Sequence, residues 1–182
     1  MTRALVVLAD GFEETEAVTT IDLLRRAGVD VVVAALAGDR ARGSHGIELQ
    51  GDASFGQVAD EPYDALVLPG GQPGATHLAA DARVLERIRS QAGEGRLLAA
   101  ICAAPSVLAV AGVLAGRRVT AFPGALAADA APGLELTDDA VVRDGNLITS
   151  RGPGTAMDFA LALIDALEGR ATRDRIEAAL QR

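Results

Sequence analysis

The chain has 182 residues, with 17 basic and 25 acidic side chains and a formal net charge of −8. Every basic residue is an arginine, and the chain has one cysteine, Cys102, and two histidines. This inventory excludes lysine Schiff-base chemistry, an internal disulfide and cysteine-based zinc or iron–sulfur clusters, and it leaves little material for any metal site. An acidic chain with 3% aromatic residues also lacks the basic surface that nucleic-acid binding needs.

The N-terminal apolar run covers only residues 4–9 and ends in Asp10-Gly11. It is too short for a signal-peptide core or a membrane span, and it reads as a strand followed by a turn. A length of this size usually forms one hydrophobic core. We therefore expect a single, cytoplasmic domain over residues 1–182, with no membrane and no nucleic acid among its partners.

Short apolar runs alternate with helical patterns along the chain. Runs that are apolar on both faces are typical of buried parallel strands, and stripes at helical spacing predict helices. The expected strands are residues 4–9, 29–36, 65–68 and 97–101, with weaker candidates at 119–122, 140–143 and 147–150. The expected helices are residues 15–27, 82–92, 103–114, 153–167 and 172–180. An Asp144-Gly145-Asn146 turn joins the last two strands.

This alternation predicts an α/β fold with a mostly parallel sheet and helices on both of its faces. In such folds ligands bind beyond the carboxyl ends of the strands. The segments that follow the expected strands are Asp10-Gly11, Pro69-Gly70-Gly71, Cys102 and residues 151–154. The candidate site should therefore be sought among them.

Cys102 lies where the fourth strand ends and a helix is expected to begin, with Pro105 suited to the first helical turn. Ala100 and Ala104 flank it at two residues on either side, and such small residues allow the sharp turn of a nucleophile elbow. We expect the amides of Cys102, Ala103 and Ala104 to point at the sulfur and the helix N-terminus to lower the pKa of the thiol. The alternative is a small, buried and inert cysteine.

A thiolate at this position needs a proton partner and an anion site. His45 is expected on a turn off the sheet and His77 closer to the site, and neither is assigned a role. The carboxylates of residues 13, 14 and 16 follow the first strand on the same rim, although acids at a helix start also complement the helix dipole. If one of them faces Cys102, it must share a proton with the sulfur. Gly70 and Gly71 offer bare amides to an oxyanion.

Taken together and in order, these motifs resemble the ThiJ/PfpI superfamily, in particular the branch that contains the human Parkinsonism-associated deglycase and bacterial YajL. The motifs are Ala-Leu-Val-Val-Leu at residues 4–8, Gly-Phe-Glu-Glu-Thr-Glu at 11–16, Val-Leu-Pro-Gly-Gly at 67–71, Ala-Ala-Ile-Cys-Ala-Ala-Pro at 99–105 and Thr-Ser-Arg-Gly-Pro-Gly-Thr at 149–155.

The resemblance implies a flavodoxin-like three-layer sandwich and a homodimer packed partly through the first helix. By motif position, Cys102 corresponds to the family's oxidation-prone nucleophile and Glu16 to the acid that hydrogen-bonds its sulfur. Gly71, with its neighbour Gly70, and Ala103 correspond to the amide donors of the anion pocket. The implied activity needs no cofactor or metal: it is glyoxalase or deglycase chemistry on small dicarbonyls or glycated substrates. The alternative is a redox-regulated chaperone or oxidative-stress sensor without significant turnover.

Two departures from the family pattern limit this transfer. Protease-like members carry a histidine directly after the cysteine, where this chain has Ala103, so a Cys-His peptidase is not expected. The human protein of the branch has a histidine where this chain has Phe122, and YajL-like members share the phenylalanine. Because phenylalanine cannot transfer protons, Glu16 would do the acid–base work alone or with water.

Overall fold

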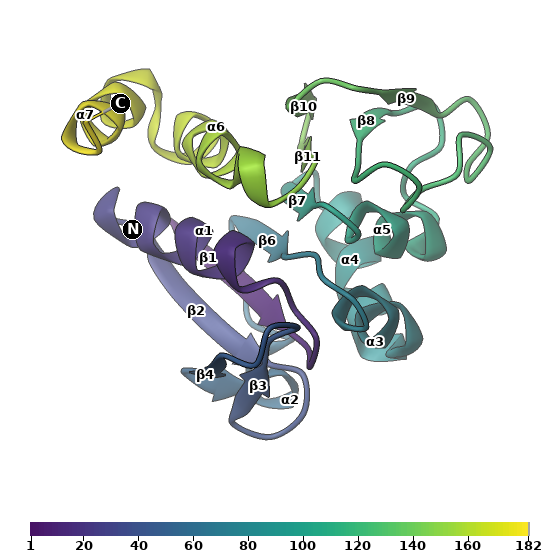
Figure 1. Cartoon of the computed structure of the whole chain (residues 1–182), viewed down its shortest axis with the longest axis horizontal. Coiled ribbons are helices and arrows are strands. Elements are labelled where there is room, and N and C mark those ends of the chain that lie inside the picture. Colours follow the sequence, from purple (N-terminus) through teal and green to yellow (C-terminus); the bar gives the residue numbers. More distant parts are fainter. Residues whose placement is uncertain (182) are drawn as a thin grey trace.

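The computed structural model describes residues 1–181, and a seven-stranded sheet forms its centre (Figure 1). In spatial order the strands are β10 (Val141–Asp144), β11 (Leu147–Ser150), β7 (Leu97–Ile101), β6 (Ala65–Leu68), β1 (Arg3–Leu8), β2 (Asp30–Ala35) and β5 (Ala53–Ser54). All neighbouring pairs are parallel except β10 with β11. The order β2-β1-β6-β7-β11 is that of a flavodoxin-like doubly wound sheet, so the predicted fold class is confirmed.

Helices cover both faces of the sheet and make the outer two layers (Figure 1). One layer contains α1 (Glu14–Arg26), α6 (Ala156–Glu168) and α7 (Arg170–Ala179), and the other contains α3 (Gly74–Ala80), α4 (Ala82–Gly93) and α5 (Pro105–Ala111). A single turn, α2 (Phe55–Val58), packs beside β2 and β5. Among the helices of residues 1–181, none is long and apolar enough to cross a membrane.

The central strands are apolar on both faces because helices cover both faces. Residues 4–8 of β1 are completely buried, and all of β6 is buried as well. One continuous hydrophobic core extends from β1 through α6 and reaches Ile176 on α7. A parallel sheet of this kind brings the carboxyl ends of β1, β6, β7 and β11 to one edge.

Two small sheets lie outside the central one, and the sequence analysis did not anticipate them. β3 (Arg40–Arg42) pairs with β4 (Glu48–Gln50), and β8 (Arg118–Thr120) pairs with β9 (Glu135–Thr137). β3, β4 and β9 are short and largely exposed, so they carry no apolar run that a sequence pattern could show. The strand predicted at 119–122 is β8, which ends at Thr120 and pairs outside the central sheet.

Two helix predictions need correction at their ends. The helix predicted at 103–114 begins only at Pro105, because the turn at Cys102 must be completed first, and it ends before Gly112, which is left-handed at φ +79°. The helix predicted at 153–167 opens with a 3-10 turn, η1 (Pro153–Thr155), before α6. The short helices α2 and α3 were not predicted, because each is too short to show a period.

Candidate active site

Cys102 occupies a sharp turn between β7 and α5, as predicted for a nucleophile elbow. Its backbone is left-handed, with φ +63°, a conformation that costs a non-glycine residue about 1–2 kcal/mol. Hydrogen bonds on both sides hold it there: the Cys102 amide donates to the Ser150 carbonyl at 2.9 Å, and the Phe122 amide donates to the Cys102 carbonyl at 2.9 Å. The sequence analysis missed these two supports because the backbone of any residue could provide them.

The predicted set of amides around the sulfur is partly wrong. The Cys102 amide is engaged by Ser150, and the Ala104 amide donates to the Ile101 carbonyl at 3.0 Å. Only the Ala103 amide remains for the sulfur, and the amide of Gly71 joins it from the loop after β6. The pairing of β7 with β11 uses the Cys102 amide, and the closing of the turn uses the Ala104 amide. The sulfur therefore has two backbone donors from two separate loops.

Glu16 reaches the sulfur from the first turn of α1 and is completely buried. Its Oε2 accepts a hydrogen bond from the Gly70 amide at 2.8 Å, and the carboxyl group also hydrogen-bonds the side chain of Cys102. Oε1 is buried and has no hydrogen-bond partner within residues 1–181. Glu13 caps the same helix by accepting from the Glu16 amide at 2.7 Å. Of the three acids that the residues alone left open, Glu16 is the one placed at Cys102.

Burial raises the pKa of both side chains. Burial raises the pKa of Glu16 to about 7, against the opposing hydrogen bonds from Gly70 and Cys102. Burial and the Glu16 carboxylate raise the pKa of Cys102 to about 12, and these effects outweigh the amides of Gly71 and Ala103. The lowered thiol pKa expected from the helix N-terminus is therefore wrong. Between about pH 7 and about pH 12 the pair holds one proton in all.

Positions 70 and 71 need glycine because neighbouring atoms lie too close to leave room for a side chain. The backbone amides of both residues are also used, by Glu16 and by the sulfur of Cys102. A Cβ on Gly70 would lie 2.6 Å from the Cβ of Cys102 and 2.8 Å from Oε2 of Glu16, inside van der Waals contact. Gly71 has φ +90°, where an added Cβ would also collide with the backbone of the loop after β1. No larger residue fits at either position while the pair stays in contact.

Neither histidine is hydrogen-bonded to Cys102. His45 lies on the turn between β3 and β4, where its Nδ1 is 3.0 Å from Oε2 of Glu14. His77 lies on α3, where its Nδ1 is 2.8 Å from the Asp10 carbonyl oxygen. Within the described chain the carboxyl group of Glu16 is thus the acid–base group beside the sulfur.

One group of side chains has metal-ligating atoms close together: Glu13, Glu14 and His45, within 4.8 Å of one another. The Glu14 carboxylate is already used by the turn after β3, accepting from the amides of His45 and Ile47, the Ser44 hydroxyl and the His45 ring. Burial opposes its ionisation, but the hydrogen bonds from His45 and the backbone prevail and lower the pKa of Glu14 to about 2. Glu14 therefore acts as an anchor for this turn.

Comparison with known proteins gives a consistent result. Residues 2–166 match the DJ-1/PfpI family. The chain is 45% identical to DJ-1beta of Drosophila melanogaster over 168 residues (92% of this chain, 90% of the relative), and 35% identical to the glutathione-independent glyoxalase DJR-1.2 of Caenorhabditis elegans over 167 residues (91% and 89%). The crystal structure of Drosophila DJ-1beta superposes with a TM-score of 0.92 at 42% identity, covering 99% of this chain and 97% of that one. Oxidized DJ-1 of Toxoplasma gondii gives 0.93 at 35% identity, covering 100% and 98%.

Proposed function

The chain belongs to the DJ-1/PfpI family, and from this premise we propose that it protects against reactive dicarbonyls or their adducts through covalent catalysis by Cys102. The observation that carries the proposal is the buried pair of Cys102 and Glu16, which share a proton beside the amides of Gly71 and Ala103. A thiol, a proton carrier and an anion site in contact are what addition to a carbonyl requires. A relative at 35% identity carries the name of a glutathione-independent glyoxalase.

With methylglyoxal the proposed steps balance as the addition of one water. The thiol of Cys102 gives its proton to the Glu16 carboxylate as its sulfur attacks the aldehyde carbon, and the C=O π bond breaks as the C–S bond forms. The amides of Gly71 and Ala103 hold the new oxyanion, and the thiol proton later passes from Glu16 to the former ketone oxygen, which becomes the hydroxyl of lactate. Glu16 then moves the proton from this carbon to the neighbouring one, which leaves a thioester on the sulfur. Water cleaves the thioester, releasing lactate and restoring the thiol. Phe122 offers no titratable group, so Glu16 and water carry all the proton transfers.

The same site favours a second candidate, a redox sensor or redox-regulated chaperone. Cys102 is the only cysteine of the chain, so no second thiol can resolve its oxidation as an internal disulfide. Two peroxide molecules would each give the sulfur one oxygen and leave as water, producing a sulfinate. The amides of Gly71 and Ala103 and a protonated Glu16 are suitable donors to those oxygens. Either role suits the cytoplasm, where thiols stay reduced.

Purified protein is expected to convert methylglyoxal to lactate without glutathione, nucleotide or added metal. The measurement is the amount of lactate formed against time, compared with heat-denatured protein. Turnover of many equivalents per chain supports the catalytic role. If methylglyoxal is consumed only to one equivalent per chain and no lactate appears, catalysis is excluded and the redox role is favoured.

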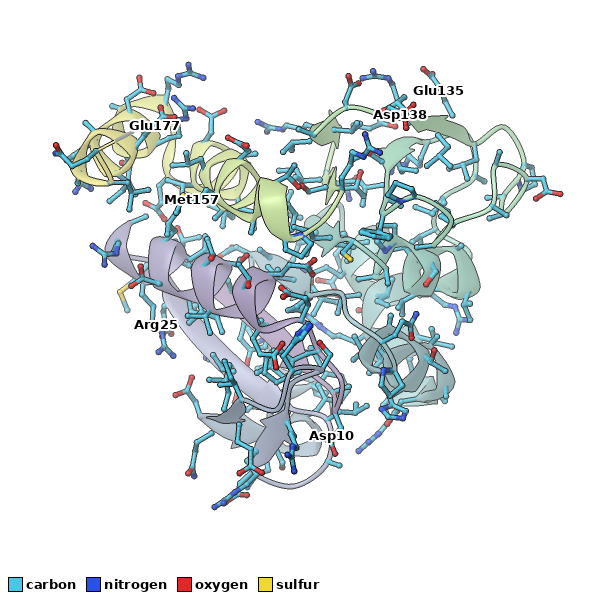
Figure 2. All side chains as sticks on the ribbon, in the orientation of Figure 1. Asp10, Arg25, Glu135, Asp138, Met157 and Glu177 are labelled. Carbon is cyan, nitrogen blue, oxygen red and sulfur yellow. The ribbon has the colours of Figure 1, made fainter. Side chains whose placement is uncertain are left out.

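We further propose that two copies pair through the face formed by α1 and α6. These helices pack against each other, and their outer surface exposes Val18 on α1 (46%) and Met157 on α6 (45%, labelled in Figure 2). Exposed apolar side chains that gather on one face are typical of an interface between subunits. Sedimentation equilibrium is expected to give twice the chain mass of 18.6 kDa, and Val18→Asp is expected to shift it to the monomer. A wild-type monomer at high protein concentration would contradict the pairing.

A further inference from the structure

A cleft of about 440 Å³ lies between α2 and α4, and it shares no lining residue with the Cys102 site. Its α2 side is formed by Gly56, Ala59 and Asp60, and the α4 side carries two arginines, Arg83 and Arg87. The arginines are four residues apart, so they lie on the same face of the helix, where like charges repel each other. The cleft therefore holds two cations side by side, and three acids, Asp60, Glu86 and Glu94, also line it.

Arg87 is a buried cation that forms no ion pair within residues 1–181, although the charges of Glu94 and Asp60 act on it at longer range. Its side chain lines the cleft although the residue is only 8% exposed. Its Nη2 donates to Oε1 of Gln91 at 2.6 Å, its Nε has no hydrogen-bond partner, and no carboxylate of the described residues lies within ion-pair distance. Burying a cation in this way is costly unless an anion pairs with it.

Arg83 faces the cleft from one helical turn away. Its Nε and Nη2 bind Asp81, at 3.0 and 2.6 Å, which leaves Nη1 free of that pair. Nη1 lies over the cleft floor, since a Cβ built on Gly56 would be 3.4 Å from it. The available donor of Arg83 is thus directed to the side of the cleft that α2 forms.

Each guanidinium group also lies within cation–π distance of an aromatic ring. The Arg83 guanidinium lies over the Phe55 ring at 5.8 Å, and that of Arg87 over the Tyr63 ring at 5.7 Å. Stacking of this kind occupies the faces of the guanidinium groups and leaves their N–H edges for an acceptor. Two oriented arginines are the usual means of binding a planar carboxylate or a phosphate group.

We propose that this cleft binds a compact oxyanion, a phosphate or carboxylate group, held by Arg87 with help from Arg83. The acids at its rim restrict the size of the ligand. Asp60 and Glu86 are exposed and line the cleft, and Glu94 is paired with Arg96 at 3.0 Å. Their negative charge repels an extended polyanion, whereas a small anion reaches the arginines beneath them.

Calorimetric titration of the wild-type protein at low ionic strength, with inorganic phosphate and separately with acetate, tests this site. Millimolar binding of at least one anion is expected. Arg87→Met keeps an unbranched apolar stem but removes the guanidinium group, and it should weaken that binding at least about tenfold. Arg83→Gln should weaken it several-fold. Arg175→Gln, which removes the same charge from an exposed position on α7, should bind as the wild type does. Lactate formation should be unchanged in all three variants, because none touches Cys102.

Each outcome decides the proposal. Preference for phosphate or for acetate identifies the chemistry of the ligand. The site is refuted if neither anion binds the wild type, or if Arg87→Met binds as tightly as Arg175→Gln. If thermal unfolding shows that Arg87→Met is not folded, the exposed Arg83→Gln decides, and unchanged binding by that variant also refutes the site.

Discussion

Replacing Cys102 by alanine is expected to lower the rate of lactate formation from methylglyoxal at least about a thousandfold. The substitution removes the atom that forms the C–S bond and leaves Glu16 and the amides of Gly71 and Ala103 in place. What remains can bind the dicarbonyl and polarise its oxygen, but it cannot form the thioester. A loss of that size corresponds to about 4 kcal/mol of transition-state stabilisation.

Cys102→Ser is the matched control for this result. Serine keeps the shape and polarity of the side chain on the strained turn, but its hydroxyl is a far weaker nucleophile than a thiol. Both variants are expected to unfold at nearly the wild-type temperature and to be inactive. If Cys102→Ala produces lactate at the wild-type rate, the covalent mechanism is refuted. Under mild peroxide, the wild type but neither variant should gain two oxygens at residue 102, as peptide mass mapping would show.

Glu16→Gln is expected to slow turnover about a hundredfold or more, because the site loses the acid–base group that lies beside the sulfur. The same change should make the thiol more acidic. The pKa of Cys102 is raised to about 12 by burial and by the Glu16 carboxylate, and glutamine removes that negative charge while its amide can still donate to the sulfur. A variant with a more reactive thiol and slower turnover separates the proton-transfer role of Glu16 from a structural one.

The free energy of unfolding should also depend on the ionisation of Glu16. The pKa of Glu16 is raised from an ordinary 4.5 to about 7, so the folded state favours the protonated carboxyl. Its stabilising effect is complete below about pH 4.5 and is lost as the pH rises through about 7. The loss amounts to about 3 kcal/mol. In urea unfolding, the wild type should lose stability relative to Glu16→Gln over this interval.

Glu13→Gln is the matched control for both effects. It makes the same substitution at the cap of the same helix, and the glutamine oxygen can still accept from the Glu16 amide. Turnover and the pH profile should stay near those of the wild type. Equal losses in Glu13→Gln and Glu16→Gln would mean that any charge change at the start of α1 disturbs the site, and the assignment of the proton carrier would fail.

Those parts of the fold could be predicted in which a local sequence pattern is compatible with only one kind of secondary structure. The apolar runs of β1, β6 and β7 indicate burial on both faces, and the small residues around Cys102 indicate the turn. The hairpin of β3 and β4 could not be predicted, because its strands are polar. Its turn is held by hydrogen bonds to Glu14, which is distant in sequence.

The pKa values at the site depend on contacts between residues that are far apart in the sequence, so the sequence alone could not predict them. Glu16 meets Gly70 across 54 positions, so the residues alone could not choose it among three acids, and only the family resemblance did. The helix N-terminus predicted an acidic thiol, but the burial of Cys102 beside a carboxylate reversed the direction. Arg87 was likewise unremarkable, since nothing in its local pattern distinguishes a buried arginine from an exposed one.

The central claim is that Cys102 and Glu16 share one proton, and the pH dependence of Cys102 alkylation by iodoacetamide tests it most directly. The wild-type rate should stay low through neutral pH, because above about pH 7 the Glu16 carboxyl group has lost its proton and the one proton left on the pair lies on the sulfur. The rate should rise only towards pH 12, as the thiolate forms. Glu16→Gln should show a single step below pH 12. A single step at the ordinary thiol pKa of about 8.5, identical in the wild type and in Glu16→Gln, would contradict the claim.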